Sequence, residues 1–358
     1  MGVTSVTRVL RKVFAEMGCC TASKPFKKQF IMNLYLSFSH WNHDISVRVS
    51  EKSGAGEPSP DFLIYLSFHM KQLEKEGRYS SFRMERALKG KLLRFRKSSS
   101  LPVSDITPDF IKQFEEFLIY EVGNSHNTVT ECLKTFGKLV KDIYSSEEGL
   151  NCDDNPFNRI RFTRCQTERC YLSEVEINRL MALHLTKNTP LWHSRNLFYM
   201  ECYTGLRIGD LLSLKWKNYD AGTKTVTLTM HKTHRQITVP LTQKVVSVLE
   251  SYRDLFSTPD KYVFPFLKLH DTSFSLGKAI CSATGIVNGH LKTLALRCGI
   301  EKNLSSHAGR HTFATMLVTK GANIYDVKEL LGHSDVKVTQ IYARITQERK
   351  QAAISLLE

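Results

Sequence analysis

One stretch of the chain, residues 225–239, has the pattern of a β-hairpin and limits how much sheet the protein can contain. It is rich in β-branched residues and alternates in character, as two paired strands do. The regions before it, residues 61–150 and 172–214, have helical spacing, and so does the chain from Thr242 onward. The sequence therefore predicts a mainly α fold with a small β-hairpin or sheet.

The 358 residues favour two domains and allow three, because a domain usually takes roughly 100–200 residues. A linker composition rich in Gly, Ser and Pro ends at Pro60, and the run Asp-Asp-Asn-Pro marks a boundary within 151–157. We therefore expect a helical domain over 58–155 and a mixed α/β domain over 165–358. Residues 1–57 form either a small extra module or a poorly ordered leader, and their role is unclear.

One predicted helix carries a stripe of basic residues. It is capped by Ser80 or Ser81 and runs to about Lys97. Its apolar face is made of Met84, Leu88, Leu92 and Phe95. Four basic residues fall on the opposite face, namely Arg83, Arg86, Arg94 and Lys97. Such a stripe is either a solvated face or a surface for DNA phosphates, and its single sign favours the second.

Local signals place three further helix starts. The run Thr107-Pro-Asp begins a helix whose core side carries Phe110, Phe114, Phe117 and Leu118. A third helix of the first domain is expected from about Thr128 to Tyr144. Ser173 and Glu176 have the spacing of a capping box, which predicts the first helix of the second domain.

The charge of the chain points to a polyanionic partner. Fifty Lys and Arg against 35 Asp and Glu leave a formal charge of +15. A merely basic protein would have the same balance, so the charge alone does not decide between the two interpretations.

Composition also argues against a membrane, disulfide or metal protein. No apolar run is long enough to span a membrane, and charged residues interrupt every apolar stretch near the start, so we expect a soluble, cytoplasmic chain. The nine cysteines show no CxxC pair and no disulfide framework. His231 and His234 would point to opposite faces of a strand, which disfavours a metal site between them.

Three segments carry residues that suggest phosphate chemistry. In the first, Gly205 precedes a helix whose first turn holds Arg207, and a cation there favours an external anion because the helix dipole opposes it. In the second, His307 and Arg310 share one face near a helix start, where backbone N–H groups favour phosphate. Taken singly, each of these segments is more typical of an ordinary surface arginine or a structural pair.

The third segment ends in a tyrosine. Gly332 ends a helix, His333 lies just beyond it, and a short restarted segment carries Tyr342. By itself, Tyr342 would be a half-buried aromatic side chain in most proteins.

Taken together, these segments resemble the tyrosine recombinase (phage-type integrase) family. The match covers roughly residues 170–350 in order and spacing, through TGLRIGDLLSLKW, the lysine hairpin, HAGRHTFAT and LLGHSDVKVTQIYARI. Residues 61–150 are similar in pattern to the core-binding domain of the family. The resemblance implies a helical core-binding domain and a catalytic domain that form a C-shaped clamp around double-stranded DNA.

The resemblance also assigns roles to individual residues. It implies six catalytic residues and one supporting acid, which are Arg207, Lys232, His307, Arg310, His333, Tyr342 and, in support, Asp210. The two arginines and two histidines would lie at the scissile phosphate, and the tyrosine would be the nucleophile. The weakest assignment is Lys232, because Lys224 also lies near the hairpin.

The chemistry requires these residue types. Two guanidiniums can neutralise a phosphodiester and stabilise the charge that accumulates in the transition state. A tyrosine hydroxyl has a pKa of about 10, so it needs a base or a positive field, and His307 is the expected proton acceptor. His333 would donate a hydrogen bond to the phosphate, and Lys232 would protonate the leaving 5′ hydroxyl. The phosphate ends as a 3′-phosphotyrosine ester that retains the energy of the cleaved bond, so the reaction requires no ATP, metal or other cofactor.

Two other functions stay open on the sequence. A monomeric type IB-like topoisomerase resembles this active site, and a non-catalytic DNA-binding regulator would explain the charge. The recombinase interpretation implies a mobile element and a synaptic tetramer on DNA, with accessory proteins that set direction or bend DNA as further candidate partners. Residues 346–358 look like an amphipathic helix that could dock on a neighbouring protomer, which favours the recombinase.

Overall fold

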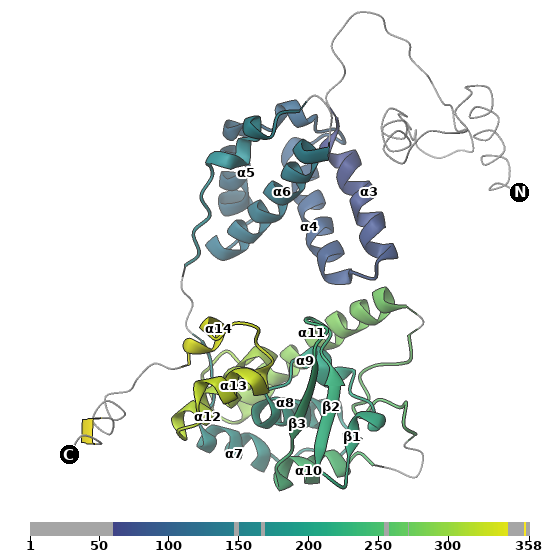
Figure 1. Cartoon of the computed structure of the whole chain (residues 1–358), viewed down its shortest axis with the longest axis vertical. Coiled ribbons are helices and arrows are strands. Elements are labelled where there is room, and N and C mark those ends of the chain that lie inside the picture. Colours follow the sequence, from purple (N-terminus) through teal and green to yellow (C-terminus); the bar gives the residue numbers. More distant parts are fainter. Residues whose placement is uncertain are drawn as a thin grey trace, which may run out of the picture. The chain divides into compact units, whose positions relative to one another are not determined.

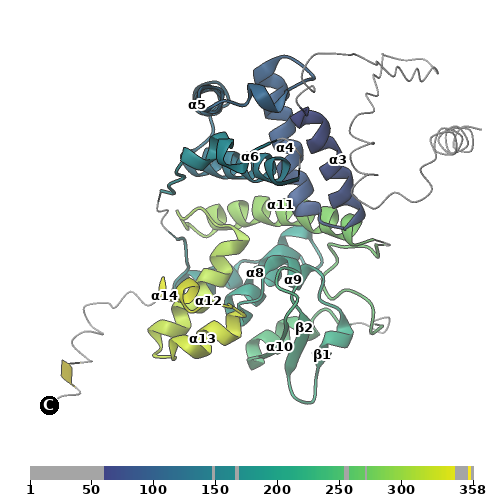
Figure 2. The ribbon, with the colours of Figure 1, turned by 45° about the horizontal axis from the view of Figure 1, so that its top comes forward.

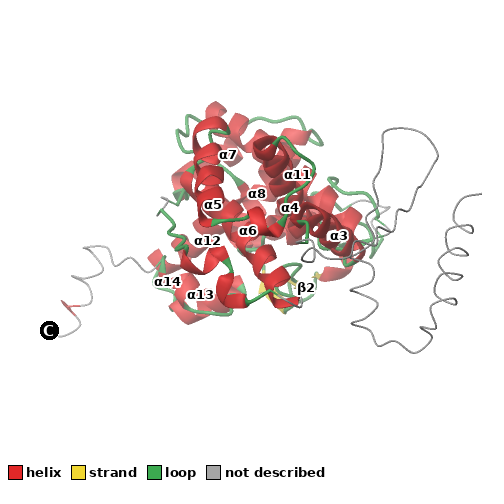
Figure 3. Cartoon of the chain, turned by 90° about the horizontal axis from the view of Figure 1, so that it is seen from above, coloured by secondary structure: helices red, strands yellow, loops and turns green. Residues whose placement is uncertain are grey.

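Helices make up most of the described chain. The computed structural model describes residues 60–146, 150–165, 169–253, 258–270, 272–342 and 354–355. Within these residues the structure has one small sheet among many helices, which confirms the predicted fold class (Figures 1 and 3). The expectations for residues 1–57 lie outside the described residues, as do those for all of 346–358 except residues 354 and 355.

The contacts divide the described chain into two compact units. The first contains the chain up to Ser67, Lys91–Val122 and Gly137–Ile160. The second contains Phe68–Gly90, Gly123–Phe136 and the chain from Arg161 onward. Three helices contribute residues to both units, namely α3 (Phe62–Lys75), α4 (Tyr79–Arg96) and α6 (His126–Ser146).

An aromatic cluster forms the core of the first unit. Helix α5 (Pro108–Glu116) begins as predicted, because the side chain of Thr107 accepts a hydrogen bond from the backbone N–H of Phe110 at 3.2 Å. A π-helical turn, Phe117–Glu121, extends it. The ring of Phe95 lies 5.3–5.4 Å, between centroids, from the rings of Phe110, Phe114 and Phe117. The predicted core side of this helix is therefore confirmed.

Helix α4 differs from its prediction at two places. It begins at Tyr79, before either expected serine cap. Met84 is 44% exposed, so its assignment to the apolar face was wrong, and the buried position belongs to Glu85 at 5% exposure. The carboxylate of Glu85 can be buried because its Oε2 lies 2.8 Å from Nδ1 of His69. Leu88 and Leu92 are buried as predicted.

The end of α6 is followed by two short turns. The helix confirms the predicted third helix, and the 3-10 turns Cys152–Asp154 and Pro156–Arg159 come after it. Phe157 packs against Gly137, where an added Cβ would lie 2.8 Å from the phenylalanine ring. The chain is thus held on α6 through the region in which we expect a domain boundary.

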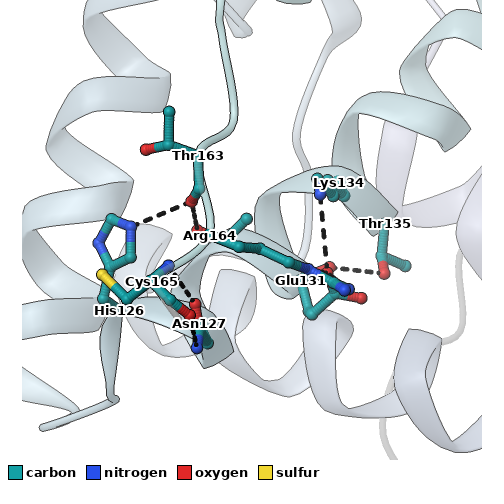
Figure 4. Close-up of polar contacts among 9 residues, drawn as sticks. His126, Asn127, Glu131, Lys134, Thr135, Thr163, Arg164 and Cys165 are labelled. Atoms are coloured by element: carbon teal, nitrogen blue, oxygen red, sulfur yellow. Dashed lines mark hydrogen bonds and ion pairs between the residues drawn. The ribbon is translucent and has the colours of Figure 1, made fainter. Parts of the chain in front are cut away.

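The next residues of the chain are bound to the beginning of α6 (Figure 4). The Asn127 side chain exchanges two hydrogen bonds of 3.0 Å with the backbone of Cys165. Arg164 forms an ion pair with Glu131, and the hydroxyl of Thr130 donates to the Thr163 carbonyl at 3.2 Å. The connecting chain is therefore anchored as far as residue 165.

A buried helix, α8 (Pro190–Thr204), forms the centre of the second unit (Figure 2). Eleven of its 15 residues are buried, because helices contact it on several sides. These are α7 (Glu174–Ala182), α9 (Ile208–Leu212), α10 (Gln243–Glu250), α11 (Ser273–Arg297) and α12 (Ser306–Thr319). Two short helices follow, α13 (Ile324–Leu331) and α14 (Lys337–Gln340). The predicted capping box of Ser173 and Glu176 starts α7.

The hairpin prediction is confirmed, with a third strand added. Strands β1 (Tyr219–Asp220), β2 (Thr225–Thr229) and β3 (Gln236–Pro240) pair antiparallel in sequence order. One face buries the apolar side chains Val226, Leu228, Ile237 and Val239. The other face carries threonines, of which Thr227 and Thr238 are hydrogen-bonded at 2.9 Å. The alternation in the sequence thus corresponds to one buried and one polar face.

Gly205→Ala should destabilise the second unit by roughly 2–5 kcal/mol. Gly205 ends α8 with φ +66°, and an added Cβ would lie 2.4 Å from Cδ1 of Phe313. Urea unfolding would measure the loss. The matched control is Gly285→Ala inside α11, where nothing lies within 4 Å of an added Cβ, and it should stabilise by about 0.5–1 kcal/mol. Equal effects of the two variants would contradict this account.

Candidate active site

Arg310 is the most buried of the basic residues predicted for the site. It lies on α12, is 7% exposed, and donates from Nη1 to the Gly205 carbonyl and from Nη2 to the Leu331 carbonyl, both at 2.5 Å. These carbonyls belong to the C-terminal ends of α8 and α13, where the helix dipole favours a cation. The guanidinium has five N–H donors, so it can bind these two carbonyls and still face a ligand.

Arg207 lies beside it but not where the sequence indicated. It is the residue before α9, in extended conformation, rather than part of the first turn, because the chain leaves the left-handed turn at Gly205 before the helix starts. Its side chain is half-buried and donates from Nη1 to Sδ of Met230 at 3.1 Å. The pKa of Arg310 is lowered to about 10, mainly by burial and then by the charge of Arg207.

The two predicted histidines face this positive charge. His307, in the first turn of α12, has a lowered pKa, first from removal of water and then from the charges of Arg310 and Lys232. His333 follows Gly332, which ends α13 with φ +62° as predicted. Burial and then the charge of Arg310 lower the pKa of His333 to about 4. Both rings are therefore neutral at neutral pH.

His333 is also oriented by a buried partner. Its Nδ1 is hydrogen-bonded at 2.9 Å to the hydroxyl of Thr339, a side chain with no exposed surface. This bond engages one ring nitrogen and leaves the other for a ligand.

Asp210 connects the hairpin turn to α9. Its carboxylate is 3% exposed and accepts a hydrogen bond from the backbone N–H of His231 at 2.9 Å. Lys232, next in this exposed turn between β2 and β3, is close enough to act on His307 by its charge. Lys224 lies at the opposite end of β2 and donates to the Gln243 side chain at 3.1 Å. The geometry therefore favours Lys232 over Lys224 as the hairpin lysine.

The structure corrects the argument about the paired histidines. His231 and His234 lie in the turn rather than on a strand, and Nε2 of His231 lies 2.7 Å from the hydroxyl of Ser213. Within the described residues, no three His, Cys, Asp or Glu side chains come together as a metal site. In the same part of the chain, no helix has both the length and the apolar character that a membrane crossing requires.

Tyr342 lies just beyond α14 and is half-buried against the Phe313 and Leu331 cluster. Its hydroxyl is hydrogen-bonded to Nδ1 of His311 at 2.7 Å. The guanidinium of Arg169 lies 5.9 Å from the centre of its ring. Burial raises the pKa of Tyr342, while the charges of Arg169 and Arg310 lower it and oppose that rise. Without DNA, the hydroxyl therefore keeps its proton.

The predicted catalytic residues thus form one cluster of side chains that act on one another by charge, joined by two residues that the sequence reasoning missed. His311 directly follows Arg310 in the matched segment HAGRHTFAT, so its place beside that residue was a signal that could have been used. Arg169 lies in the chain before α7, and nothing in its local sequence marks it. It acts by charge on Tyr342 and on all three histidines, which places it at the same site.

Comparison with known proteins shows the family of the chain. The model of the phage integrase family matches residues 171–349, and that of the phage integrase SAM-like domain matches residues 61–162. A tyrosine recombinase of Pseudothermotoga lettingae is 31% identical over 209 residues, which are 57% of this chain and 67% of that protein. A tyrosine recombinase of Thermosipho africanus is 29% identical over 205 residues, 57% of this chain and 68% of that protein.

Solved structures share the fold. The Tn1549 transposon integrase, in complex with a circular intermediate DNA, has a TM-score of 0.60 and 18% identity over 83% of this chain and 99% of that one. The XerH site-specific recombinase bound to a palindromic difH substrate also has a TM-score of 0.60, with 16% identity over 83% of this chain and 96% of that one. The family models and the curated relatives favour a recombinase over a topoisomerase or a non-catalytic regulator. The chain belongs to the phage integrase family and is a site-specific tyrosine recombinase, an enzyme that breaks and rejoins DNA.

Proposed function

We propose that this recombinase cleaves DNA by attack of Tyr342 on a phosphodiester. The attack forms a 3′-phosphotyrosine ester, which retains the energy of the broken bond. The observation that carries the proposal is a cluster of basic side chains around a tyrosine. No carboxylate among the described residues forms an ion pair with Arg207 or Arg310, although both are at least half-buried. A buried cation favours an anionic partner, and a DNA phosphate supplies one.

Each predicted catalytic side chain of this cluster has a proposed role. Arg207 and Arg310 bind the non-bridging oxygens and stabilise the negative charge of the transition state. His333 donates a hydrogen bond to the phosphate, and His307 is the proposed proton acceptor. Lys232, on its exposed turn, protonates the leaving 5′ oxygen. Reversal of these steps rejoins the strand, and the ester supplies the energy, so no ATP or metal is needed.

The test is covalent capture. A DNA substrate with a nick near the scissile bond releases a short fragment on cleavage and traps the protein on the strand, where denaturing electrophoresis detects the adduct. The substrate should come from the DNA that neighbours the gene, since the target sequence is not known. The absence of an adduct on every site that the protein binds specifically would count against the proposal.

We further propose which part of the chain forms each domain. A core-binding domain over 58–155 and a catalytic domain over 165–358 would together clamp double-stranded DNA, and the family-model matches to 61–162 and 171–349 support these boundaries. The role of residues 1–57 stays unassigned. Because the substrate is DNA, we expect the enzyme to work in the cytoplasm.

Strand exchange requires two DNA sites, and we propose a synaptic tetramer with residues 346–358 docked on an adjacent protomer. The support is limited to a relative: lambda integrase has been solved as a dimer on a core site. Deletion of 346–358 should spare binding to a single site and prevent two-site complexes in a gel-mobility assay. A truncated protein that still pairs sites would contradict the docking. Accessory proteins that direct the reaction or bend DNA are further candidate partners.

The exposed basic residues of α4, together with Lys97 directly after the helix, are a proposed DNA-backbone surface. Its four residues are exposed in the structure, namely Arg83, Arg86, Arg94 and Lys97. Replacing all four by Ala should weaken binding to every sequence and lower the salt slope by about one unit per lost phosphate contact. The control variant removes the same charge from exposed lysines elsewhere, Lys187, Lys217, Lys224 and Lys244. Equal salt slopes for the two variants would make α4 a solvated face.

A further inference from the structure

The hydroxyl of Tyr342 has a partner that its proposed role does not explain. It is hydrogen-bonded at 2.7 Å to Nδ1 of His311, and the two rings lie 5.7 Å apart between centroids at an angle of 50°. His311 is on α12, one residue after Arg310, whereas Tyr342 follows α14. The bond therefore joins the proposed nucleophile to the helix that carries the buried arginine.

The neighbouring charges set the protonation state of the His311 ring. Burial, followed by the charges of Arg169, His307 and Arg310, lowers the pKa of His311 to about 4, so its ring is neutral and has one nitrogen lone pair. Arg169 acts on the tyrosine oxygen by charge and hydrogen bonding, and a guanidinium can only donate. When the lone pair of the neutral ring lies on Nδ1, His311 can accept the hydroxyl proton of Tyr342, while the phenol oxygen can still accept a hydrogen bond from a guanidinium.

We propose that His311 is a positioning residue, which accepts the hydrogen bond of the Tyr342 hydroxyl and holds the nucleophile oxygen beside Arg310 before DNA binds. The proposal rests on Tyr342 being the nucleophile. The physical reason is pre-organisation: a side chain beyond the end of α14 would otherwise sample several positions, and only one of them allows attack. His307 lies one turn earlier on α12, with its ring centroid 6.2 Å from that of His311, so the two rings divide the task. His311 holds the hydroxyl before attack, and His307 keeps its proposed role as proton acceptor during attack.

The test uses a pair of substitutions at one position. His311→Phe keeps a ring but has no acceptor, and adduct formation should slow roughly tenfold to hundredfold, as expected for a nucleophile misplaced by about 1 Å. His311→Asn keeps an acceptor near the place of Nδ1 and should restore most of the rate. DNA affinity should be unchanged in both. His184→Asn, at an exposed position after α7, is the control for loss of a histidine.

Two results would overturn the proposal. One is a His311→Phe variant that forms adduct as fast as the wild type. The other is a His311→Asn variant as slow as His311→Phe, because a positioning role requires only an acceptor.

A second measurement is independent of catalysis. In protein labelled with ¹³C at tyrosine Cζ, the Tyr342 signal, identified by its loss in Tyr342→Phe, should shift in His311→Phe and stay close to wild type in His311→Asn. An unshifted signal in DNA-free His311→Phe would show that the bond is not formed. This readout separates two failures. If only the positioning role is wrong, the signal does not shift in His311→Phe. If the proposed function is wrong, Tyr342→Phe still forms the adduct.

Discussion

Tyr342→Phe should abolish the covalent protein–DNA adduct and leave DNA affinity unchanged. The substitution removes one oxygen and keeps the ring that packs against Phe313 and Leu331. It also removes the hydrogen bond to His311, which should cost only about 0.5–1.5 kcal/mol of stability. No other atom can then form the ester at this position. Covalent capture with a nicked substrate, followed by denaturing electrophoresis, measures the result.

The matched control for this prediction is Tyr325→Phe. Tyr325 is 62% exposed on α13, so the same chemical change there should leave the adduct at the wild-type level. An adduct formed by Tyr342→Phe as efficiently as by the wild type would remove Tyr342 from the mechanism, and Tyr325 would be the next tyrosine to test.

Arg310→Ala should lose both cleavage and stability, whereas Arg207→Ala should lose mainly cleavage. Removing one pre-organised charge donor slows such a reaction by roughly a hundredfold to a thousandfold, and this applies to both arginines. Only Arg310 also binds the carbonyls of Gly205 and Leu331. A buried acceptor left without a donor costs roughly 1–3 kcal/mol, so Arg310→Ala should be measurably less stable than Arg207→Ala.

The comparison is made by urea unfolding and by the single-turnover rate of adduct formation. Arg310→Lys provides an intermediate case, because one ammonium lacks the planar fork that reaches two carbonyls at once. It should recover part of the stability and little of the rate. Equal stability of Arg310→Ala and Arg207→Ala would show that the two carbonyl bonds contribute nothing to the fold.

The sequence alone determined those features that depend on residues close together in the chain. The capping box at Ser173, the helix end at Gly332 and the hairpin over residues 225–239 were all predicted, because each arises from local backbone chemistry or from a simple period. The family was recognisable for a similar reason, since its motifs are short segments in a given order. In the structure, charged residues of those motifs lie in one cluster.

Only the tertiary structure decided which side chains meet. Spacing placed Met84 in a core that Glu85 enters instead, because a distant histidine, His69, satisfies its carboxylate. The bond from His311 to Tyr342 joins residues 31 positions apart, and Arg169 reaches the same hydroxyl from before α7. Such contacts depend on how helices pack and on which groups lose water, and neither property is encoded in the period or composition of a single segment.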